Sequence, residues 1–459
     1  MKFPKEFVWG AAAASYQIEG AFEDDGKGLS VWDMLCRQPG RIWHNQTGAV
    51  ACDHYHRYKE DVALMKAIGL QAYRLSVSWP RVMPQGVGAV NSKGLDFYDS
   101  LVDELLGAGI EPWVTLFHWD FPYDLFLRGG WLNPDSPRWF ADYAQVVVDK
   151  LSDRVSNWMT LNEPQCFIGL GHQQGGHAPG LKLGLEEVLL AGHHVLLAHG
   201  RAVQVIRASA NKKPCVGWAP VGLAGIPFSD EPQDMEALRR HIFRVHPDGV
   251  WNNVWWGDPV VLGHYPEEGL RAYGKAVPKF TEAEMETIHQ PLDFYGANIY
   301  GSPLIKAGAN GEVTEPHYPP GHPITHFYWE MTPESLYWGP KYLYERYKLP
   351  IVITENGMAN TDWVSLDGRV HDAQRIDLVQ RYLRELGRAI SEGVDVRGYF
   401  LWSIMDNFEW AEGYKQRFGL IHVDYATQTR TLKDSAYWYK TVIESNGEAT
   451  SDSSPSIGN

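Results

Sequence analysis

Short apolar runs alternate with amphipathic segments along almost the whole chain. Each of eight such runs ends in a polar or aromatic residue, as expected of strands buried in a parallel sheet. The runs cover residues 8–16, 71–79, 111–119, 157–163, 214–220, 293–300, 350–356 and 397–405. This alternation predicts an α/β protein whose strands follow one another at regular intervals.

The segments between these runs place apolar residues at spacings of three and four, which is the period of an amphipathic helix. This spacing predicts helices over residues 53–68, 95–109, 137–151 and 372–390. Asp53 and Asp372 stand where two of these helices begin and are predicted to cap them, while Pro137 is predicted to open a third.

Eight strands alternating with helices predict a (β/α)8 TIM barrel. A doubly wound sheet is the alternative, but no G-x-G-x-x-G follows the first strand. No Pro/Ser-rich or charged linker interrupts the pattern, so residues 1–445 are predicted to form a single domain. Residues 219–256 and 301–333 are rich in Gly, Pro and aromatic residues and are predicted to be long loops over the active-site face. Residues 446–459 are predicted to be a disordered tail.

The composition narrows the classes of function. The chain has 459 residues, of which 44% are hydrophobic and 21% are charged, as in soluble globular proteins. A net charge of −15 opposes binding to nucleic acid or to an anionic membrane surface. The start of the chain lacks the apolar core of a signal peptide, and no run has the length of a membrane span. We therefore expect a cytoplasmic enzyme that binds neither nucleic acid nor a membrane. Its four cysteines are widely spaced and are expected to stay reduced.

Two glutamates occur in matching contexts at the ends of predicted strands. Glu163 lies in Thr-Leu-Asn-Glu-Pro at residues 160–164, and Glu355 lies in Ile-Thr-Glu-Asn-Gly at residues 353–357. Catalytic groups of a parallel barrel sit at the carboxyl ends of its strands. Hydrolysis of a glycosidic bond needs a proton donor together with a nucleophile or a base, and two carboxyl groups can supply both. A structural role as a loop cap or an Arg partner is the alternative for either glutamate, but the matched contexts favour an acid/base site.

Polar and aromatic residues at other strand ends are expected at the same rim. They are Gln17, Arg74, His118, Trp119, Asn298, Tyr300 and Trp402. Amides, His and Tyr offer the donors and acceptors that a polyhydroxylated ring needs. An arginine beside a carboxylate favours its ionised form, so Arg74 suits the support of a nucleophile. Each of these residues taken alone is equally compatible with a structural role.

Two groups of histidines are candidate metal ligands. His54 and His56 stand beside Asp53 at a helix start, where an Asp is a natural cap. His193, His194 and His199 fall in an apolar helical segment, where core or surface positions are expected. No metal and no cofactor is predicted.

Over nearly its whole length, to about residue 445, the chain resembles the family 1 glycoside hydrolases, the β-glucosidase family. Phe-Val-Trp-Gly at residues 7–10 and Ser-Tyr-Gln-Ile-Glu-Gly at residues 15–20 resemble the N-terminal signature of this family. The segments around Glu163 and Glu355 resemble its acid/base and nucleophile motifs. The resemblance implies a barrel with these glutamates at the ends of strands 4 and 7.

The resemblance also implies a reaction. Glu355 would attack the anomeric carbon and Glu163 would protonate the departing oxygen, with the carboxyl groups about 5–5.5 Å apart and retention of configuration. The substrates would carry a terminal non-reducing β-D-glucosyl residue, as cellobiose, short cello-oligosaccharides and aryl or alkyl β-glucosides do. Some β-galactosidase and β-fucosidase activity is expected, with glucose as the product of glucoside hydrolysis.

The family's sugar site carries over residue by residue. Ring hydroxyls would be held by Gln17, His118, Trp119, Asn162, Glu409 and Trp410. Asn162 would bind the 2-hydroxyl and Trp402 would form the stacking floor. Asn298, Tyr300 and Arg74 would position Glu355, while Phe418 would line the sugar pocket and Trp329 the leaving-group side.

The segment around Glu409 narrows the substrate. Family members that act on phospho-sugars have Ser in place of Glu409 and Trp410, so the resemblance implies an unphosphorylated sugar. Plant thioglucosidases usually have Gln where Glu163 stands, which argues against that branch. The chain departs from many relatives at Gln165-Cys166, Ile299 and Tyr328, so the sequence does not fix the leaving-group preference.

Two other classes of function compete. A carbohydrate-binding barrel that has lost catalysis would show damage at Glu163 or Glu355, and both are present. A barrel enzyme using phosphate or a metal would need a glycine-rich loop or a ligand cluster, and neither motif occurs. The sequence leaves open a homo-oligomer and the choice between glucose, galactose and fucose.

Overall fold

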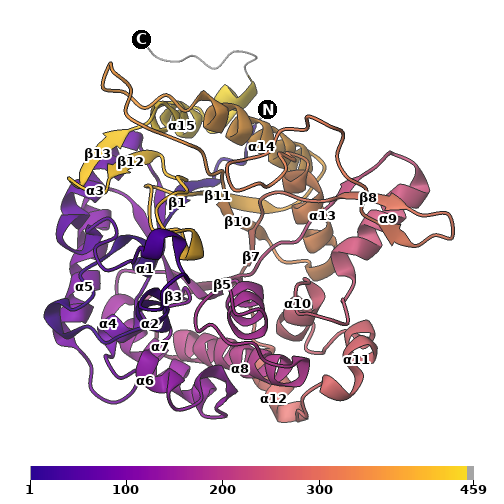
Figure 1. Ribbon diagram of the computed structural model, residues 1–459, viewed down its shortest axis with the longest axis horizontal. Helices are drawn as coiled ribbons and strands as arrows, with labels where there is room; N and C mark the ends of the chain where they lie inside the picture. The colour runs from indigo at the N-terminus through magenta and orange to yellow at the C-terminus, as the bar shows by residue number, and fades with distance from the viewer. Residues whose placement is uncertain (1, 452–459) are drawn as a thin grey trace.

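Eight parallel strands form the centre of the computed structural model, which describes residues 2–451, and helices surround them (Figure 1). The hydrogen-bonded order of the strands is β5-β4-β3-β2-β1-β11-β10-β7. Their bounds are β1 (Val8–Ala12), β2 (Ala72–Ser76), β3 (Glu111–Phe117), β4 (Asn157–Asn162), β5 (Cys215–Ala219), β7 (Tyr295–Asn298), β10 (Ile351–Asn356) and β11 (Val396–Trp402). The sequence predicted all eight, but several are shorter than expected.

Backbone hydrogen bonds close the sheet between its two end strands. Asp293 N donates to Val216 O at 2.8 Å, and Asn298 N donates to Pro220 O at 3.0 Å. Gly222 N donates in turn to Asn298 O at 2.9 Å. The carboxyl ends of all eight strands therefore meet at one end of a barrel, which confirms the predicted (β/α)8 architecture.

Amphipathic helices cover the outside of the barrel. The principal ones are α3 (His54–Ile68), α5 (Ser92–Gly107), α7 (Ser136–Leu151), α8 (Leu185–Ser209), α10 (Val254–Val261), α12 (Glu282–Ile288), α13 (Ser335–Tyr347), α14 (Ala373–Ser391) and α15 (Asp434–Glu444). Pro137 lies in the first turn of α7, as predicted. None of the helices within residues 2–451 combines the length and the apolar character needed to cross a membrane.

Neither of the two Asp side chains predicted to cap a helix does so. Asp53 and Asp372 do stand at the N-caps of α3 and α14, but neither side chain accepts a hydrogen bond from the helix backbone. Asp53 instead pairs with His56 and Arg57. Asp372 pairs with Arg375 and accepts from Ser435. Both carboxylates are used by charged or hydroxyl partners, which compete with backbone N–H groups.

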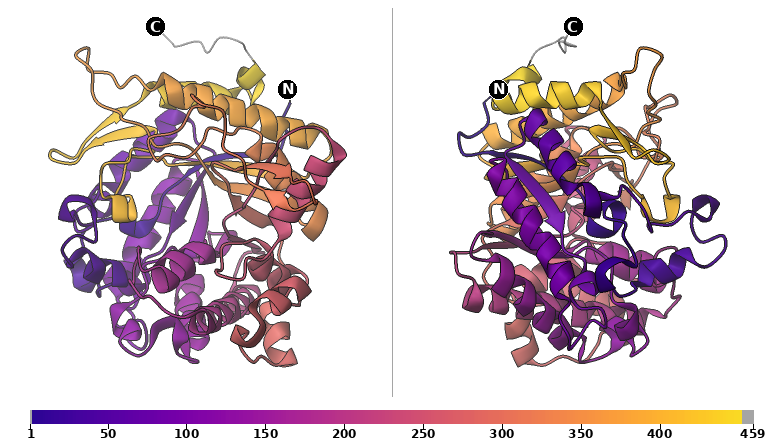
Figure 2. Two further views of the ribbon diagram at one scale, coloured as in Figure 1. Left: turned by 45° about the vertical axis from the view of Figure 1, so that its right-hand side comes forward. Right: turned by 90° about the vertical axis from the view of Figure 1, so that its left-hand side faces the viewer.

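Short elements lie in the connections between strand and helix. They are α1 (Ser15–Ile18), α2 (Val31–Cys36), α4 (Trp79–Val82), α6 (Tyr123–Phe126), α9 (Pro232–Phe243), α11 (Glu267–Tyr273), β6 (Ile226–Pro227), β8 (Leu304–Ala307), β9 (Val313–Thr314), β12 (Ile421–Asp424) and β13 (Thr429–Leu432). The two long loops predicted over residues 219–256 and 301–333 carry β6, α9, β8 and β9. Figure 2 shows these elements on one side of the barrel and the β12–β13 hairpin on the opposite side.

The prediction of a disordered tail from Asn446 is wrong for residues 446–451. Asn446 Oδ1 accepts from Trp9 Nε1 at 2.9 Å, and a 3₁₀ helix, η7, spans Glu448–Ser451. Polar composition suggested disorder, but a buried indole N–H from the start of the chain fixes this segment in place. The remainder of the predicted tail, residues 452–459, lies outside the described residues.

Candidate active site

A cavity of about 620 Å³ opens at the carboxyl ends of the barrel strands. Both glutamates singled out from the sequence line it, Glu163 directly after β4 and Glu355 within β10. Nine further residues predicted for the sugar site line it as well, namely His118, Trp119, Asn298, Tyr300, Trp329, Trp402, Glu409, Trp410 and Phe418. Side chains from strands far apart in the sequence thus meet in one place.

Glu355 is buried and held by charged and neutral donors. Arg74 Nη1 donates to Glu355 Oε1 at 2.5 Å, and Tyr300 Oη donates to Oε2 at 3.0 Å. Burial raises the pKa of Glu355, while Arg74, Tyr300 and Asn298 act to lower it. The carboxylate with the arginine beside it is therefore the one that ionises first. Arg74 and Tyr300 stand where the sequence predicted them, beside Glu355.

Glu163 has a different environment. Its side chain is buried, accepts a hydrogen bond from Asn298 Nδ2 to Oε1 at 2.8 Å and is in contact with the Cys166 thiol. Burial raises the pKa of Glu163 to about 8, with a further contribution from the negative charge of Glu355. At neutral pH this carboxyl group keeps its proton. Asn298 was predicted to position Glu355, but its amide donates to Glu163, although it also lowers the pKa of Glu355.

Asn162 hydrogen-bonds to both of the residues that support the two carboxyl groups, Arg74 and Asn298. Its Oδ1 accepts from Arg74 Nη2 at 2.5 Å and from Asn298 Nδ2 at 3.0 Å. Its Nδ2 lies 3.1 Å from Nε2 of His118, whose pKa is held well below its usual range by burial and by Arg74. His118 is thus neutral, and its Nε2 can accept from the amide. The Asn162 amide thus connects Arg74, which donates to Glu355, with Asn298, which donates to Glu163.

Three residues at the site adopt left-handed backbone conformations that side chains rarely take. The φ angles are 46° at Glu163, 82° at Trp119 and 49° at Trp410. Such strain persists only where the surroundings hold it, and it gathers at functional sites. Trp119 Nε1 donates to the backbone oxygen of Asn162 at 2.9 Å. That bond uses its N–H and leaves the ring to face the cavity.

The inner wall of the cavity is aromatic and carries a third buried carboxyl group, that of Glu409. The His118 ring stacks on Trp402 with centroids 5.7 Å apart, and Trp119 stacks on Trp410 at 4.6 Å. Gln17 Nε2 donates to Glu409 Oε2 at 3.2 Å. Burial, followed by the charge of Glu355, raises the pKa of Glu409 to about 8.

Two residues predicted to bind hydroxyls do not line the cavity themselves. Gln17 and Asn162 are fully buried and hydrogen-bond to residues that do line it. Within residues 2–451, Gln17 Oε1 has no hydrogen-bond partner. Arg74 does not line the cavity either, but it donates a hydrogen bond to Glu355, which does. Direct contact of Gln17 and Asn162 with a sugar stays a prediction.

Sequence reasoning missed a buried ionic network behind Glu409 and Trp410. Asp406 lies three residues before Glu409 and accepts from Lys433 Nζ at 2.6 Å and from the backbone N of Gly419 at 3.0 Å. The network continues through Asp362, Arg375 and Arg417. It ties both ends of the segment that carries Glu409 and Phe418. Its members are scattered along the chain, so no local signal marks them.

Other residues line the cavity without any sequence motif that indicated their position. Cys166 follows Glu163 by one turn and touches its carboxyl group, while Arg244, His246, Trp251 and Glu315 come from the two long connections. The Gly, Pro and aromatic content of those connections predicted loops over the site. It did not indicate which side chains face inward.

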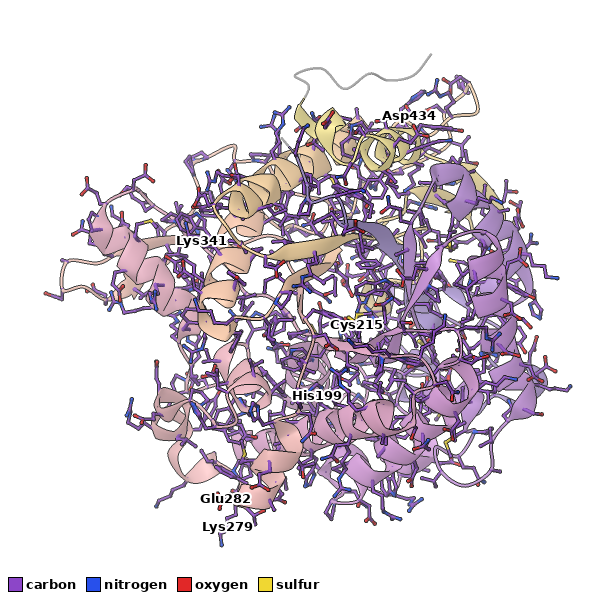
Figure 3. The ribbon with its side chains drawn as sticks, turned by 180° about the vertical axis from the view of Figure 1, so that it is seen from behind. His199, Cys215, Lys279, Glu282, Lys341 and Asp434 are labelled. Carbon is purple, nitrogen blue, oxygen red and sulfur yellow. The ribbon has the colours of Figure 1, made fainter. Side chains whose placement is uncertain are left out.

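The histidines that are candidate metal ligands have other partners. His54 Nδ1 lies 2.7 Å from Asp61 Oδ2, and His199 Nδ1 lies 2.6 Å from Thr160 Oγ1. Figure 3 labels His199, which lies on α8 and contacts the Trp218 ring of β5 with centroids 5.4 Å apart. His193 and His194 are buried on the same helix. Over residues 2–451, no group of three or more His, Cys, Asp or Glu side chains has an arrangement that could hold a metal ion.

Comparison with known proteins places this site in a family. The Glycosyl hydrolase family 1 model matches residues 1–448. Beta-glucosidase A of Thermotoga maritima is 44% identical over 448 residues, covering 97% of this chain and 98% of that protein. The 1,4-beta-D-glucan glucohydrolase of Thermotoga neapolitana is 43% identical over 448 residues, covering 97% of this chain and 99% of the relative.

Solved structures give the same result. The family 1 β-glucosidase from Thermotoga maritima superposes with a TM-score of 0.89 at 43% identity, covering 97% of this chain and 99% of that one. The same enzyme in complex with glucoimidazole also gives a TM-score of 0.89, with 44% identity and equal coverage. With its barrel, its paired glutamates and a family match over nearly all of its length, the chain belongs to glycosyl hydrolase family 1.

Proposed function

We propose that the protein is a retaining β-glucosidase that removes terminal non-reducing β-D-glucosyl residues from cellobiose, short cello-oligosaccharides and aryl or alkyl β-glucosides. One observation carries the proposal. Two buried carboxyl groups share a cavity, one beside a guanidinium and a phenol and the other beside a neutral amide. The names of the relatives, beta-glucosidase A and 1,4-beta-D-glucan glucohydrolase, support the same reaction.

Glu355 is the nucleophile and Glu163 is the acid. Arg74 and Tyr300 favour the ionised form of Glu355, which attacks the anomeric carbon. Glu163, whose pKa is raised to about 8, is protonated at neutral pH and donates its proton to the departing oxygen. The products of this step are a glycosyl ester on Glu355 and the free leaving group.

The second step reverses the roles. Ester formation removes the negative charge of Glu355, which is one cause of the raised pKa of Glu163. The pKa of Glu163 then falls, so the group can take a proton from water as the water attacks the anomeric carbon. Two inversions at that carbon retain its configuration.

The inner end of the cavity suits a neutral sugar. Glu409, Trp410 and His118 offer hydrogen bonds there, and Trp402 offers a flat face for the ring. Among the described residues that line the cavity, Arg244 is the one Lys or Arg, and it belongs to the outer wall. A 6-phosphate beside Glu409 would find no cation to pair with, so the substrate is unphosphorylated.

Hydrolysis of a p-nitrophenyl glycoside panel, combined with proton NMR of the first sugar anomer released, tests the proposal. The β-glucoside is expected to be hydrolysed, with the β-galactoside and β-fucoside slower and the 6-phosphoglucoside inert. β-Glucose should appear before its α-anomer. No turnover by folded protein would remove the hydrolase assignment, and α-glucose as the first product would replace retention with inversion.

A further inference from the structure

The cavity is larger than a single sugar ring requires. Its volume of about 620 Å³ is that of pockets enclosing whole drug-sized molecules, about 300–1,000 Å³. The residues proposed to bind the terminal glucosyl unit occupy its inner end. The outer wall comes from the connections after β5 and β7, which include α9 and the small sheet β6-β8-β9. This wall has no role in the two proposed steps.

A linked polar group lies on this outer wall. Arg244 Nε donates to His246 Nε2 at 2.7 Å, and Arg244 Nη2 donates to Glu315 Oε1 at 2.9 Å. His241 Nδ1 lies 3.5 Å from the same oxygen of Glu315. All four residues line the cavity that contains Glu163. They come from α9, from the segment after it and from the segment after β9, so the long connections assemble them.

The charges of this group favour a neutral ligand. Arg244 and Glu315 cancel each other. Burial lowers the pKa of His241 to about 4, and burial together with Arg244 lowers the pKa of His246, so both rings are neutral at pH 7. A neutral imidazole offers one donor and one acceptor. A charged leaving group would meet a like charge here. Sugar hydroxyl groups can instead hydrogen-bond to the guanidinium, the carboxylate and the imidazole rings of this group.

An aromatic face lies beside these polar atoms. Trp251 lines the same cavity and is 42% exposed. None of the aromatic pairs found among residues 2–451 includes it, so no neighbouring ring covers its faces. An indole face packs against the C–H face of a sugar, while neighbouring polar groups bind its hydroxyls.

We propose that Arg244, His246, Glu315 and Trp251 form a binding site for the outer units of a β-linked gluco-oligosaccharide of three or more sugars. The terminal non-reducing unit lies between Glu163 and Glu355, and the chain runs outward along the long connections to this outer site. The inference rests on the proposed function and extends it to substrate length.

The test is kcat/KM across a series of substrates, namely p-nitrophenyl β-glucoside, cellobiose, cellotriose and cellotetraose. Arg244→Met and Trp251→Ala are each expected to lower kcat/KM for cellotetraose about tenfold, as the loss of one contact worth about 1.4 kcal/mol would do. The value for p-nitrophenyl β-glucoside should change less than about twofold, because that substrate ends before the outer site.

The chain offers a matched control for each variant. Arg239 lies on α9 but pairs with Glu345, and its side chain is 57% exposed. Trp363 is 67% exposed on the loop after β10 and does not line the cavity. Arg239→Met and Trp363→Ala should leave the whole substrate series unchanged. Equal losses for every substrate, or no loss for cellotetraose, would overturn the outer site.

A binding measurement separates this inference from the proposed function. Calorimetric titration of cellotetraose into Glu355→Gln reports on the site without turnover. Weaker binding in Glu355→Gln/Arg244→Met than in Glu355→Gln supports the outer site even if the wild type hydrolyses no glucoside. Equal affinities in the two proteins would refute the outer site even if p-nitrophenyl β-glucoside is a good substrate.

Discussion

The two ends of the cavity are built in different ways. At the inner end, strand termini hold buried polar side chains in a continuous chain of hydrogen bonds from Glu355 through Arg74, Asn162 and Asn298 to Glu163. At the outer end, the connections after β5 and β7 supply the partly exposed Trp251 and the Arg244–Glu315 pair. The inner end is fixed by the barrel, and the outer end is fixed by loops.

This difference separates chemistry from the choice of substrate. Reacting groups must be held within a fraction of an ångström, which buried networks on rigid strands achieve. Loops accept substitutions without disturbing the barrel, so they suit the recognition of variable leaving groups. Changes at the inner end should therefore act on every substrate, and changes at the outer end on long substrates alone.

Removal of the nucleophile should give the largest effect. Glu355→Gln is expected to lower kcat for all glucosides by about 10,000-fold or more, because no carboxylate remains to attack the anomeric carbon. Steady-state assays with p-nitrophenyl β-glucoside measure this loss. Glu330→Gln, on the exposed loop beside Trp329, is the matched control and should retain activity. Substantial turnover by Glu355→Gln would mean that the inner end does not hold the nucleophile.

Removal of the acid should depend on the leaving group. Glu163→Gln is expected to lower kcat/KM for cellobiose by about 100- to 10,000-fold. A dinitrophenyl glucoside should lose much less, because its leaving group departs without a proton.

The pH profile gives a second measure of Glu163. Since the acid must be protonated to act, wild-type kcat/KM should fall as pH rises through about 8. This alkaline limb should vanish in Glu163→Gln. Equal losses for both leaving groups, with the limb unchanged, would contradict the assignment.

Loss of one support at the inner end should give a smaller effect. Tyr300→Phe removes the donor to Glu355 Oε2, which helps to lower the pKa of that group. The pKa of Glu355 should rise, so the acidic limb of the pH profile should move to higher pH, with about tenfold lower kcat at neutral pH. Tyr328→Phe, 78% exposed nearby, should change neither. A lower kcat with an unmoved acidic limb would indicate a purely structural role for Tyr300.

A change outside the cavity should affect stability alone. Asn446→Ala removes the acceptor of Trp9 Nε1 and the donors to Phe3 O and Pro4 O. Leaving a buried N–H unpaired should cost about 1–3 kcal/mol of unfolding free energy. Thermal unfolding should show the loss, with kcat unchanged, whereas Asn310→Ala on an exposed turn should show neither. An unchanged Tm would mean that residues 446–451 contribute little to the fold.

The sequence was most informative where a local pattern has a physical meaning. Apolar runs at regular intervals indicated the eight strands, and a glutamate with Pro or Gly one or two residues later marked the ends of β4 and β10. Polar composition alone was misleading at Asn446, because its partner Trp9 lies at the other end of the chain. Strand bounds were also overestimated at 8–16, where α1 begins at Ser15.

By itself, the sequence determined the barrel, the two glutamates and the residues at the strand ends, because strand periodicity and chain-breaking residues act over short distances. Only the tertiary structure decided that Asn298 supports Glu163, that Lys433 ties the segment carrying Glu409, and that Arg244 meets Glu315 in the outer wall. Each of these pairs joins residues far apart along the chain. Their meeting depends on closure of the barrel and on the paths of its loops, which no local pattern encodes.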